Sequence, residues 1–272
     1  MSVNAERRNP FLNRLRAHEL TLMLSIRSSR TADTVRIARA TGHHSIMVDL
    51  EHSAMSIDVA AQLCATAGDL GMTPFVRVVE REYGAIGQLL DCGAHGIIAP
   101  RIETANDAHL INRACRFPPR GQRSQLAMVP QLGMRPVTAR DLNPALDDAT
   151  IVQVLLETPT AIANADAIAG VDGVDILAIG ANDLTAELGV PGQYDNPRLR
   201  DAVAAVAEAC RRHGKLLMVG GIGDLSIIEP LLPLGVCSLH LTGTDTELLY
   251  SGADARATKF AQWHRQKEAS SS

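Results

Sequence analysis

Four short aliphatic runs of this chain lead into charged side chains. The residues concerned are, in chain order, Asp49, Glu51, His52, Arg77, Glu157 and Asp183. A charge inside or just beyond an apolar strand costs free energy unless it is paired or binds a metal ion. One such residue carries little information. Two well-separated carboxylates, an arginine and a histidine in the same kind of position together indicate a functional site.

The carboxylates of Glu157 and Asp183 are the predicted metal ligands. They follow the runs at 151–156 and 174–179, which are consecutive predicted strands, so both side chains can reach one point beyond the strand ends. Two carboxylates that leave positions open for water and substrate suit Mg²⁺, or Mn²⁺ or Co²⁺ at the same oxygens. A single glutamate at a strand end is more often a structural cap or an ion-pair partner, so this prediction depends on the pair.

Arg77 and His52 supply the other predicted functions. A planar guanidinium matches a carboxylate through two hydrogen bonds, and an imidazole can exchange a proton at neutral pH. Each residue also has a simpler interpretation. Arg77 could pair with a neighbouring carboxylate, Asp49 and His52 could form a turn, and Glu51 could be a solvated rim residue.

The elements that must position these residues are short aliphatic runs alternating with segments of helical period. The predicted strands are 20–26, 45–50, 73–78, 96–99, 151–156, 174–179, 215–219 and 236–241. The predicted helices between them include 57–70, 84–92, 105–115, 160–169, 197–213 and 225–234. Eight such units predict a (β/α)8 barrel, whose chemistry lies at the carboxyl ends of the strands. An open doubly wound sheet is the alternative, but no GxGxxG motif follows a strand.

We predict one barrel domain over residues 1–272. It carries a long loop insertion at about 117–150, which contains Pro130, Pro136 and Pro144, and a C-terminal helix at about 245–266, followed by a frayed tail. Long insertions after a barrel strand commonly belong to the site or to an interface.

The composition excludes several classes of protein. A formal charge of −4 gives no basis for binding nucleic acid or an anionic membrane. The amino-terminal segment is too polar for a signal peptide, and no apolar run approaches the roughly 20 residues that span a bilayer. Five scattered cysteines fit neither a disulfide framework nor a metal-binding CxxC pair. We therefore expect a cytoplasmic protein.

Seven motifs in order make the sequence resemble the HpcH/HpaI family of class II pyruvate aldolases. They are MVDLEH at 47–52, FVRV at 75–78, LLDCGAHGIIAPRIET at 89–104, FPPRGQR at 117–123, ETPTAIAN at 157–164, GVDILAIGANDLTAELG at 173–189 and HGK at 213–215. Each motif is weak alone, but the ordered set is specific. The resemblance implies a barrel of the phosphoenolpyruvate/pyruvate type that assembles as a hexamer.

The resemblance also implies an activity and a role for each site residue. The activity is cleavage of a 4-hydroxy-2-oxo acid to pyruvate and an aldehyde through a metal-stabilised enolate. Glu157 and Asp183 would bind the metal, His52 would accept the proton, Arg77 would stabilise the enolate, and Asp49 would be a further catalytic residue. Asp91 would raise the basicity of the histidine, and Glu51 would contact metal-bound water. The substrate-binding positions would be Arg77, Leu155, Ala181 and Asn182.

The sequence departs from the family pattern at several of these positions. Leu155 replaces a glutamine that commonly helps to hold pyruvate, and Gln153 lies one alternation earlier on the same face. Ser124 replaces a glycine, and GAND at 180–183 replaces GPAD. The changes leave the substrate open. A lyase of malyl- or citramalyl-coenzyme A, with Arg120 and Arg123 near the nucleotide, and an oxo-acid-binding barrel without turnover remain alternatives. Lys215 begins its strand, at the wrong face for a Schiff base.

Overall fold

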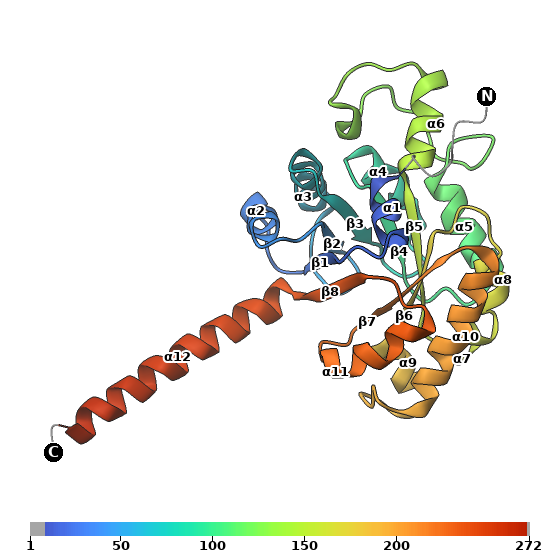
Figure 1. Cartoon of the computed structure of the whole chain (residues 1–272). Coiled ribbons are helices and arrows are strands. Elements are labelled where there is room, and N and C mark those ends of the chain that lie inside the picture. The colour runs from blue at the N-terminus through green and yellow to red at the C-terminus, as the bar shows by residue number, and fades with distance from the viewer. Residues whose placement is uncertain (1–8, 271–272) are drawn as a thin grey trace.

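Eight parallel strands form one sheet that curls into a barrel (Figure 1). The computed structural model describes residues 9–270. The strands are β1 (Thr21–Ile26), β2 (Ser45–Asp49), β3 (Thr73–Arg77), β4 (Gly96–Ala99), β5 (Ile151–Leu156), β6 (Ile176–Gly180), β7 (Leu216–Gly220) and β8 (Leu239–Thr244). Their order around the sheet is β7-β6-β5-β4-β3-β2-β1-β8. The predicted (β/α)8 barrel is therefore confirmed.

The barrel closes unevenly around its last strand. β8 pairs with β1 along most of its length, with one register shift between Met23 and Ser25. On its other side, the link to β7 is a single bridge between Leu217 and Val236, beside a hydrogen bond of 2.7 Å from the Cys237 N–H to the Leu217 carbonyl. The mouth of the barrel is consequently held together on the β1 side of β8.

Helices cover the outside of the sheet because each buries an apolar face on the strands. They are α2 (Ala32–Ala40), α3 (Ile57–Asp69), α4 (Ile86–Asp91), α5 (Ala105–Cys115), α7 (Pro159–Ala163), α8 (Ala165–Ala169), α9 (Ala181–Glu187), α10 (Pro197–His213) and α11 (Leu225–Ile228). Short 3-10 turns lie at Tyr83–Ala85 and Glu229–Leu234. The single helix predicted at 160–169 is divided at Asn164, whose amide donates to the Glu103 carbonyl at 2.8 Å.

A short helix that the sequence did not predict closes the amino end of the barrel. This helix, α1 (Pro10–Arg16), buries Phe11 among the interior side chains, with its ring 5.2 Å from that of Phe75. Gly96 makes room for Phe75, since a Cβ at 96 would lie 2.3 Å from the ring. The interior is thus filled from below, and any open pocket must face the carboxyl ends of the strands.

The segment predicted as a long loop at 117–150 is partly folded. It contains a 3-10 turn (Pro130–Leu132) and α6 (Ala139–Ala149), and Phe117, Val129, Leu142 and Leu146 form a small separate core. The Gln131 amide donates to the Leu90 carbonyl at the end of α4, at 2.6 Å. This segment therefore packs beside α4.

The last helix, α12 (Asp245–Ser270), extends away from the barrel (Figure 1). It continues beyond the end predicted near 266, and none of its side chains is buried. Residues 1–8 and 271–272 of the predicted domain, with part of the polar amino-terminal segment and of the tail, lie outside the described residues. Within 9–270, no helix combines the length and apolar character that crossing a membrane requires.

Candidate active site

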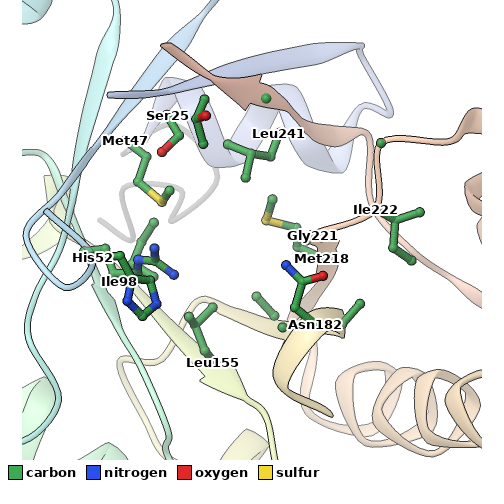
Figure 2. A pocket seen from close by; sticks show the side chains of 18 of the residues that line it. Ser25, Met47, His52, Ile98, Leu155, Asn182, Met218, Gly221, Ile222 and Leu241 are labelled. Carbon is green, nitrogen blue, oxygen red and sulfur yellow. The ribbon is translucent and has the colours of Figure 1, made fainter. Parts of the chain in front are cut away.

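A pocket of about 710 Å³ opens at the carboxyl ends of the strands. We call it the barrel pocket, and its lining includes Arg27, His52, Arg77, Leu155, Glu157, Ala181, Asn182, Asp183, Glu247 and Tyr250. In Figure 2, His52 and Asn182 lie on opposite sides of it, and Met47, Met218 and Leu241 surround its apolar interior. The predicted location of the chemistry thus coincides with a cavity large enough for a small organic acid.

Asp49 and Arg77 form a bidentate ion pair. They end neighbouring strands in paired register, which places the two side chains side by side. Arg77 donates from Nε and Nη2 to the two carboxylate oxygens of Asp49 at 3.0 and 2.6 Å. Burial alone would raise the pKa of Asp49, but the hydrogen bonds and charge of Arg77 outweigh burial and hold the pKa below its ordinary value. Asp49 therefore fixes the guanidinium at the pocket.

The turn after β2 folds back onto the same carboxylate. The N–H groups of Glu51 and His52 donate to Asp49 Oδ1 at 3.1 and 3.2 Å. Glu51 Oε2 lies 3.3 Å from Arg77 Nε and 3.6 Å from His52 Nε2. Burial raises the pKa of Glu51 despite the nearby Arg77 and His52 side chains. The His52 side chain remains 51% exposed, so its ring is in contact with both the pocket and solvent.

Glu157 lies just beyond β5 and is almost completely buried. Its Oε2 accepts a hydrogen bond of 2.9 Å from the Arg101 N–H. Gly180, the last residue of β6, leaves the space that this side chain fills, because a Cβ there would lie 2.5 Å from Oε1. Burial, together with the negative charges of Asp183 and Glu51, raises the pKa of Glu157 to about 7. The site therefore concentrates negative charge, which the Arg101 N–H and the positive charge of Arg77 offset only in part.

Asp183 lies in the first turn of α9 and lines the pocket beside Glu157. Among the described residues, no group of three or more histidine, cysteine, aspartate or glutamate side chains is arranged to bind a metal ion. The side chains that could hold a cation at this pocket are the carboxylates of Glu157 and Asp183, which would leave other coordination positions open. That composition suits a hard cation that retains water or binds substrate oxygens.

Asn182 is held in one orientation by a residue distant in sequence. The Tyr194 hydroxyl donates to Asn182 Oδ1, which leaves the amide nitrogen Nδ2 to donate elsewhere. A Cβ on Gly221 would lie 3.2 Å from this nitrogen. Ala181, the preceding residue, is buried against the pocket wall. Asn182 therefore presents a hydrogen-bond donor to the pocket.

The deeper wall is mainly apolar. Leu155 lines it from β5, and Gln153 lies two residues earlier on the same strand. The Gln153 amide nitrogen contacts Met218 Sδ at 3.6 Å, while Gln153 Oε1 and Ser25 Oγ are buried without a partner among the described residues. Gln153 thus also lines the pocket, one alternation earlier on the strand than Leu155, with its amide nitrogen on Met218.

Asp91 is not brought to His52 within this chain. It ends α4 and pairs with Arg123 at 2.7 Å, outside the pocket lining. The physical reason is topological, since α4 follows β3 and returns to the opposite end of the barrel. The basic residues considered for a coenzyme A thioester are also occupied elsewhere: Arg120 lies 3.7 Å from Asp147, and neither arginine lines the pocket.

Sequence reasoning missed several residues at the mouth. Arg27 directly follows the aliphatic run of β1, the same signal that identified the other site residues. Thr246, Glu247 and Tyr250 come from the first turns of α12, and no local pattern marks them as pocket residues.

Several known proteins are similar to this chain in sequence. It is 38% identical to the 4-hydroxy-4-methyl-2-oxoglutarate aldolase tasA of Hapsidospora irregularis, over 79% of this chain and 80% of the relative. It is 34% identical to the 4-hydroxy-2-oxovalerate aldolase of Rhodococcus jostii, over 85% and 88% of the two chains.

Solved structures share the fold. An HpcH/HpaI aldolase from Desulfitobacterium hafniense superposes with a TM-score of 0.83 at 24% identity, covering 90% of this chain and 95% of that one. Citrate synthase SbnG superposes with a TM-score of 0.80 at 25% identity, covering 92% and 97%. Residues 22–220 match the family model described as HpcH/HpaI aldolase/citrate lyase. Because this match spans most of the barrel and the relatives in sequence are named as aldolases, the chain belongs to the HpcH/HpaI family.

Proposed function

We propose that this protein is a divalent-metal-dependent aldolase that cleaves a 4-hydroxy-2-oxo acid to pyruvate and a carbonyl compound. The observation that carries the proposal is the convergence of Glu157, Asp183, Arg77 and His52 on one pocket. The relatives named as 4-hydroxy-2-oxo acid aldolases support the same reaction class.

The residues present fit a bound cation. Glu157 is buried beside a second carboxylate, and burial, with the smaller effects of the Asp183 and Glu51 charges, raises its pKa to about 7, so a bound cation would stabilise its ionised form. Glu157 and Asp183 would hold Mg²⁺, Mn²⁺ or Co²⁺. When bound, such an ion supplies Lewis-acid polarisation of a substrate oxygen.

The side chains can carry out the remaining steps. In the cleavage direction, His52 accepts the proton of the 4-hydroxyl group, and its exposed ring can pass that proton to solvent. The bond between C3 and C4 breaks, C4 becomes a carbonyl, and the electron pair moves toward the 2-oxo oxygen. Arg77, fixed in advance by Asp49, faces this developing charge and stabilises it. A proton then returns to C3, and pyruvate forms.

The test is pyruvate release from a panel of 4-hydroxy-2-oxo acids. We expect turnover that EDTA abolishes and Mn²⁺ or Mg²⁺ restores, with large losses in His52→Ala and Arg77→Ala. Trapping of substrate on a lysine by borohydride would contradict the proposal. Metal-dependent binding of pyruvate without turnover of any acid in the panel would instead support the oxo-acid-binding alternative.

We also propose that the chain forms a homo-oligomer through α12. Leu249, Phe260 and Trp263 are 72%, 67% and 55% exposed. At 100° per residue, their spacings of 11 and 14 residues place them on one face of the helix. Three large exposed apolar side chains on one side of a long helix without buried side chains fit contact with a second copy of the chain. Light scattering should give a multiple of 29.1 kDa, with a smaller species for Trp263→Lys. A wild-type monomer would contradict this assembly.

A further inference from the structure

Arg27 projects into the mouth of the barrel pocket and has no part in the proposed reaction. Its Nε lies 3.4 Å from Asp49 Oδ2, and its Nη2 donates to the His52 carbonyl at 3.0 Å. The third nitrogen, Nη1, has no protein partner within residues 9–270, and the side chain is 39% exposed. One edge of the guanidinium therefore remains available to a ligand in the pocket.

The carboxylates that contact Arg27 and Arg77 do not fully balance the two positive charges. Asp49 is completely buried and already accepts both hydrogen bonds of Arg77, so one carboxylate faces two guanidinium groups. Glu51 lies beside Arg77 rather than Arg27. Arg27 thus keeps positive charge that its own side-chain contacts do not neutralise, which suits an anionic group on a ligand.

The backbone of Arg27 is fixed before any ligand binds. The Asp245 carboxylate accepts hydrogen bonds from the N–H groups of Arg27, Ser28 and Ser29 at 2.9, 3.1 and 2.7 Å. The Arg27 carbonyl accepts a further bond of 3.1 Å from Arg30 Nη1. A residue ordered in this way loses less conformational freedom when it binds a partner.

The two arginines lie close enough together for one small dianion to reach both. Arg27 Nε and Arg77 Nη2 lie 3.4 and 2.6 Å from the same oxygen, Asp49 Oδ2. They are therefore no more than about 6 Å apart, and the terminal carbons of an extended five-carbon acid lie about 5 Å apart. A substrate whose 2-oxo oxygen faces Arg77 can thus place a carboxylate at C5 next to Arg27.

We propose that Arg27 binds the second carboxylate of a dicarboxylic 4-hydroxy-2-oxo acid and makes the site selective for such substrates. In the synthetic direction, the acceptor would be a carbonyl compound that itself bears a carboxylate. The inference rests on the proposed aldolase function for the identity of the substrate, but carboxylate recognition at Arg27 can be measured without turnover.

The experiment is calorimetric titration of the full-length, Mn²⁺-loaded protein with two five-carbon ligands, 2-oxoglutarate and 2-oxopentanoate, which differ in the second carboxylate. Wild type should prefer 2-oxoglutarate. Arg27→Met should lower the affinity for 2-oxoglutarate by about 10- to 100-fold, the factor expected for a lost charge-assisted hydrogen bond. It should change the affinity for 2-oxopentanoate by less than about threefold. Arg36→Met removes the same charge from an exposed site on α2 and serves as the matched control.

The outcomes separate this inference from the proposed function. Equal losses for both ligands in Arg27→Met would show that Arg27 only supports Asp49 and His52, and would overturn the inference. A loss of affinity in Arg27→Met for 2-oxoglutarate alone, with no turnover of 4-hydroxy-2-oxoglutarate or 4-hydroxy-2-oxopentanoate by the wild type, would support the inference and contradict the proposed aldolase function. If the protein turned over both acids with equal kcat/KM and Arg27→Met left their ratio unchanged, the aldolase function would be supported and the inference about Arg27 would be overturned.

Discussion

Gly180 offers a test of the metal site that leaves every charged residue in place. Its backbone angles, φ −81° and ψ 93°, are open to any residue, so Gly180→Ala introduces no backbone strain. The new methyl group would instead meet Glu157, at 2.5 Å from Oε1 and 2.7 Å from Cγ. The variant therefore perturbs the position of one carboxylate through contact alone.

The size of the effect follows from those distances. Non-bonded heavy atoms are most stable at about 3.5–4.0 Å, so Glu157 must retreat by roughly 1 Å. Metal–ligand distances tolerate deviations of about 0.2 Å. We therefore expect Mn²⁺ affinity to fall by about 10- to 100-fold, the range seen when ligand orientation is disturbed. Stability without metal should stay within about 1 kcal/mol, because Ala also restricts the unfolded chain.

The assay is Mn²⁺ titration, followed by calorimetry or by the electron paramagnetic resonance signal of free Mn²⁺, with thermal unfolding measured in parallel. Gly223→Ala is the matched control, since Gly223 lines the same pocket, has no positive φ, and has no atom within 4 Å of an added Cβ. Wild-type affinity in Gly180→Ala, together with loss of binding in Glu157→Gln, would refute the steric argument. Full binding in Glu157→Gln would refute the metal site itself.

Three further predictions address other parts of the structure. Tyr194→Phe removes the hydroxyl that orients Asn182, and steady-state kinetics should show kcat/KM lower by about 3- to 10-fold at unchanged oligomeric state. Asp245 is partly exposed, and the backbone hydrogen bonds that it accepts lower its pKa from 3.8 to about 2 against the opposing effect of burial. The stability that it contributes is therefore present above pH 4 and is lost as the pH falls toward 2. Urea unfolding between pH 2.5 and 6 should show a pH-dependent loss of about 1 kcal/mol after allowance for solvent screening, and Asp245→Asn should abolish this pH dependence. Lys215→Ala should keep at least half of wild-type kcat, because Lys215 Nζ bonds the Val171 carbonyl at the amino end of β7.

The strands were predictable because parallel barrel strands are buried on both faces. All six residues of β5 are buried, and the sequence shows them as a nearly continuous aliphatic run. The error is largest at β8, which runs three residues later than the predicted 236–241. Its end is built from Thr242, Gly243 and Thr244, which carry no aliphatic signal, and Thr244 pairs with Ser25 of β1 beyond the register shift. Val236, predicted as its first residue, forms only the isolated bridge to Leu217.

Several helices were not predicted from the sequence, for separate reasons. In α2 only Val35 and Ala38 are buried, so the buried face of this helix is short. α9 begins at Ala181, directly after β6 ends, and no turn residues separate the two elements. α6 carries Pro144 within it, a residue that normally predicts the end of a helix.

Register explains why part of the site was accessible from sequence. Asp49 and Arg77 end adjacent strands, and in-register pairing places them together without further information. The contact between Arg27 and Asp245 spans 218 residues and exists only because β8 returns to pair with β1. No local pattern contains that closure. Within one chain, α4 carries Asp91 away from the mouth, so the expected approach of Asp91 to His52 is not made inside a single copy.

The two kinds of chemistry come from opposite halves of the barrel. β1, β2 and β3 lead into or carry Arg27, His52 and Arg77, which have the cationic and proton-transferring roles in our proposals, whereas β5 and β6 lead into the carboxylates Glu157 and Asp183. Neither half alone can both bind a cation and face the charge that develops on the substrate. The halves meet through β4–β5 pairing on one side and through β8 on the other, where β1 provides nearly all of the pairing. Since Asp245 follows β8 directly and bonds the loop after β1, closure of the barrel and placement of Arg27 depend on the same contact.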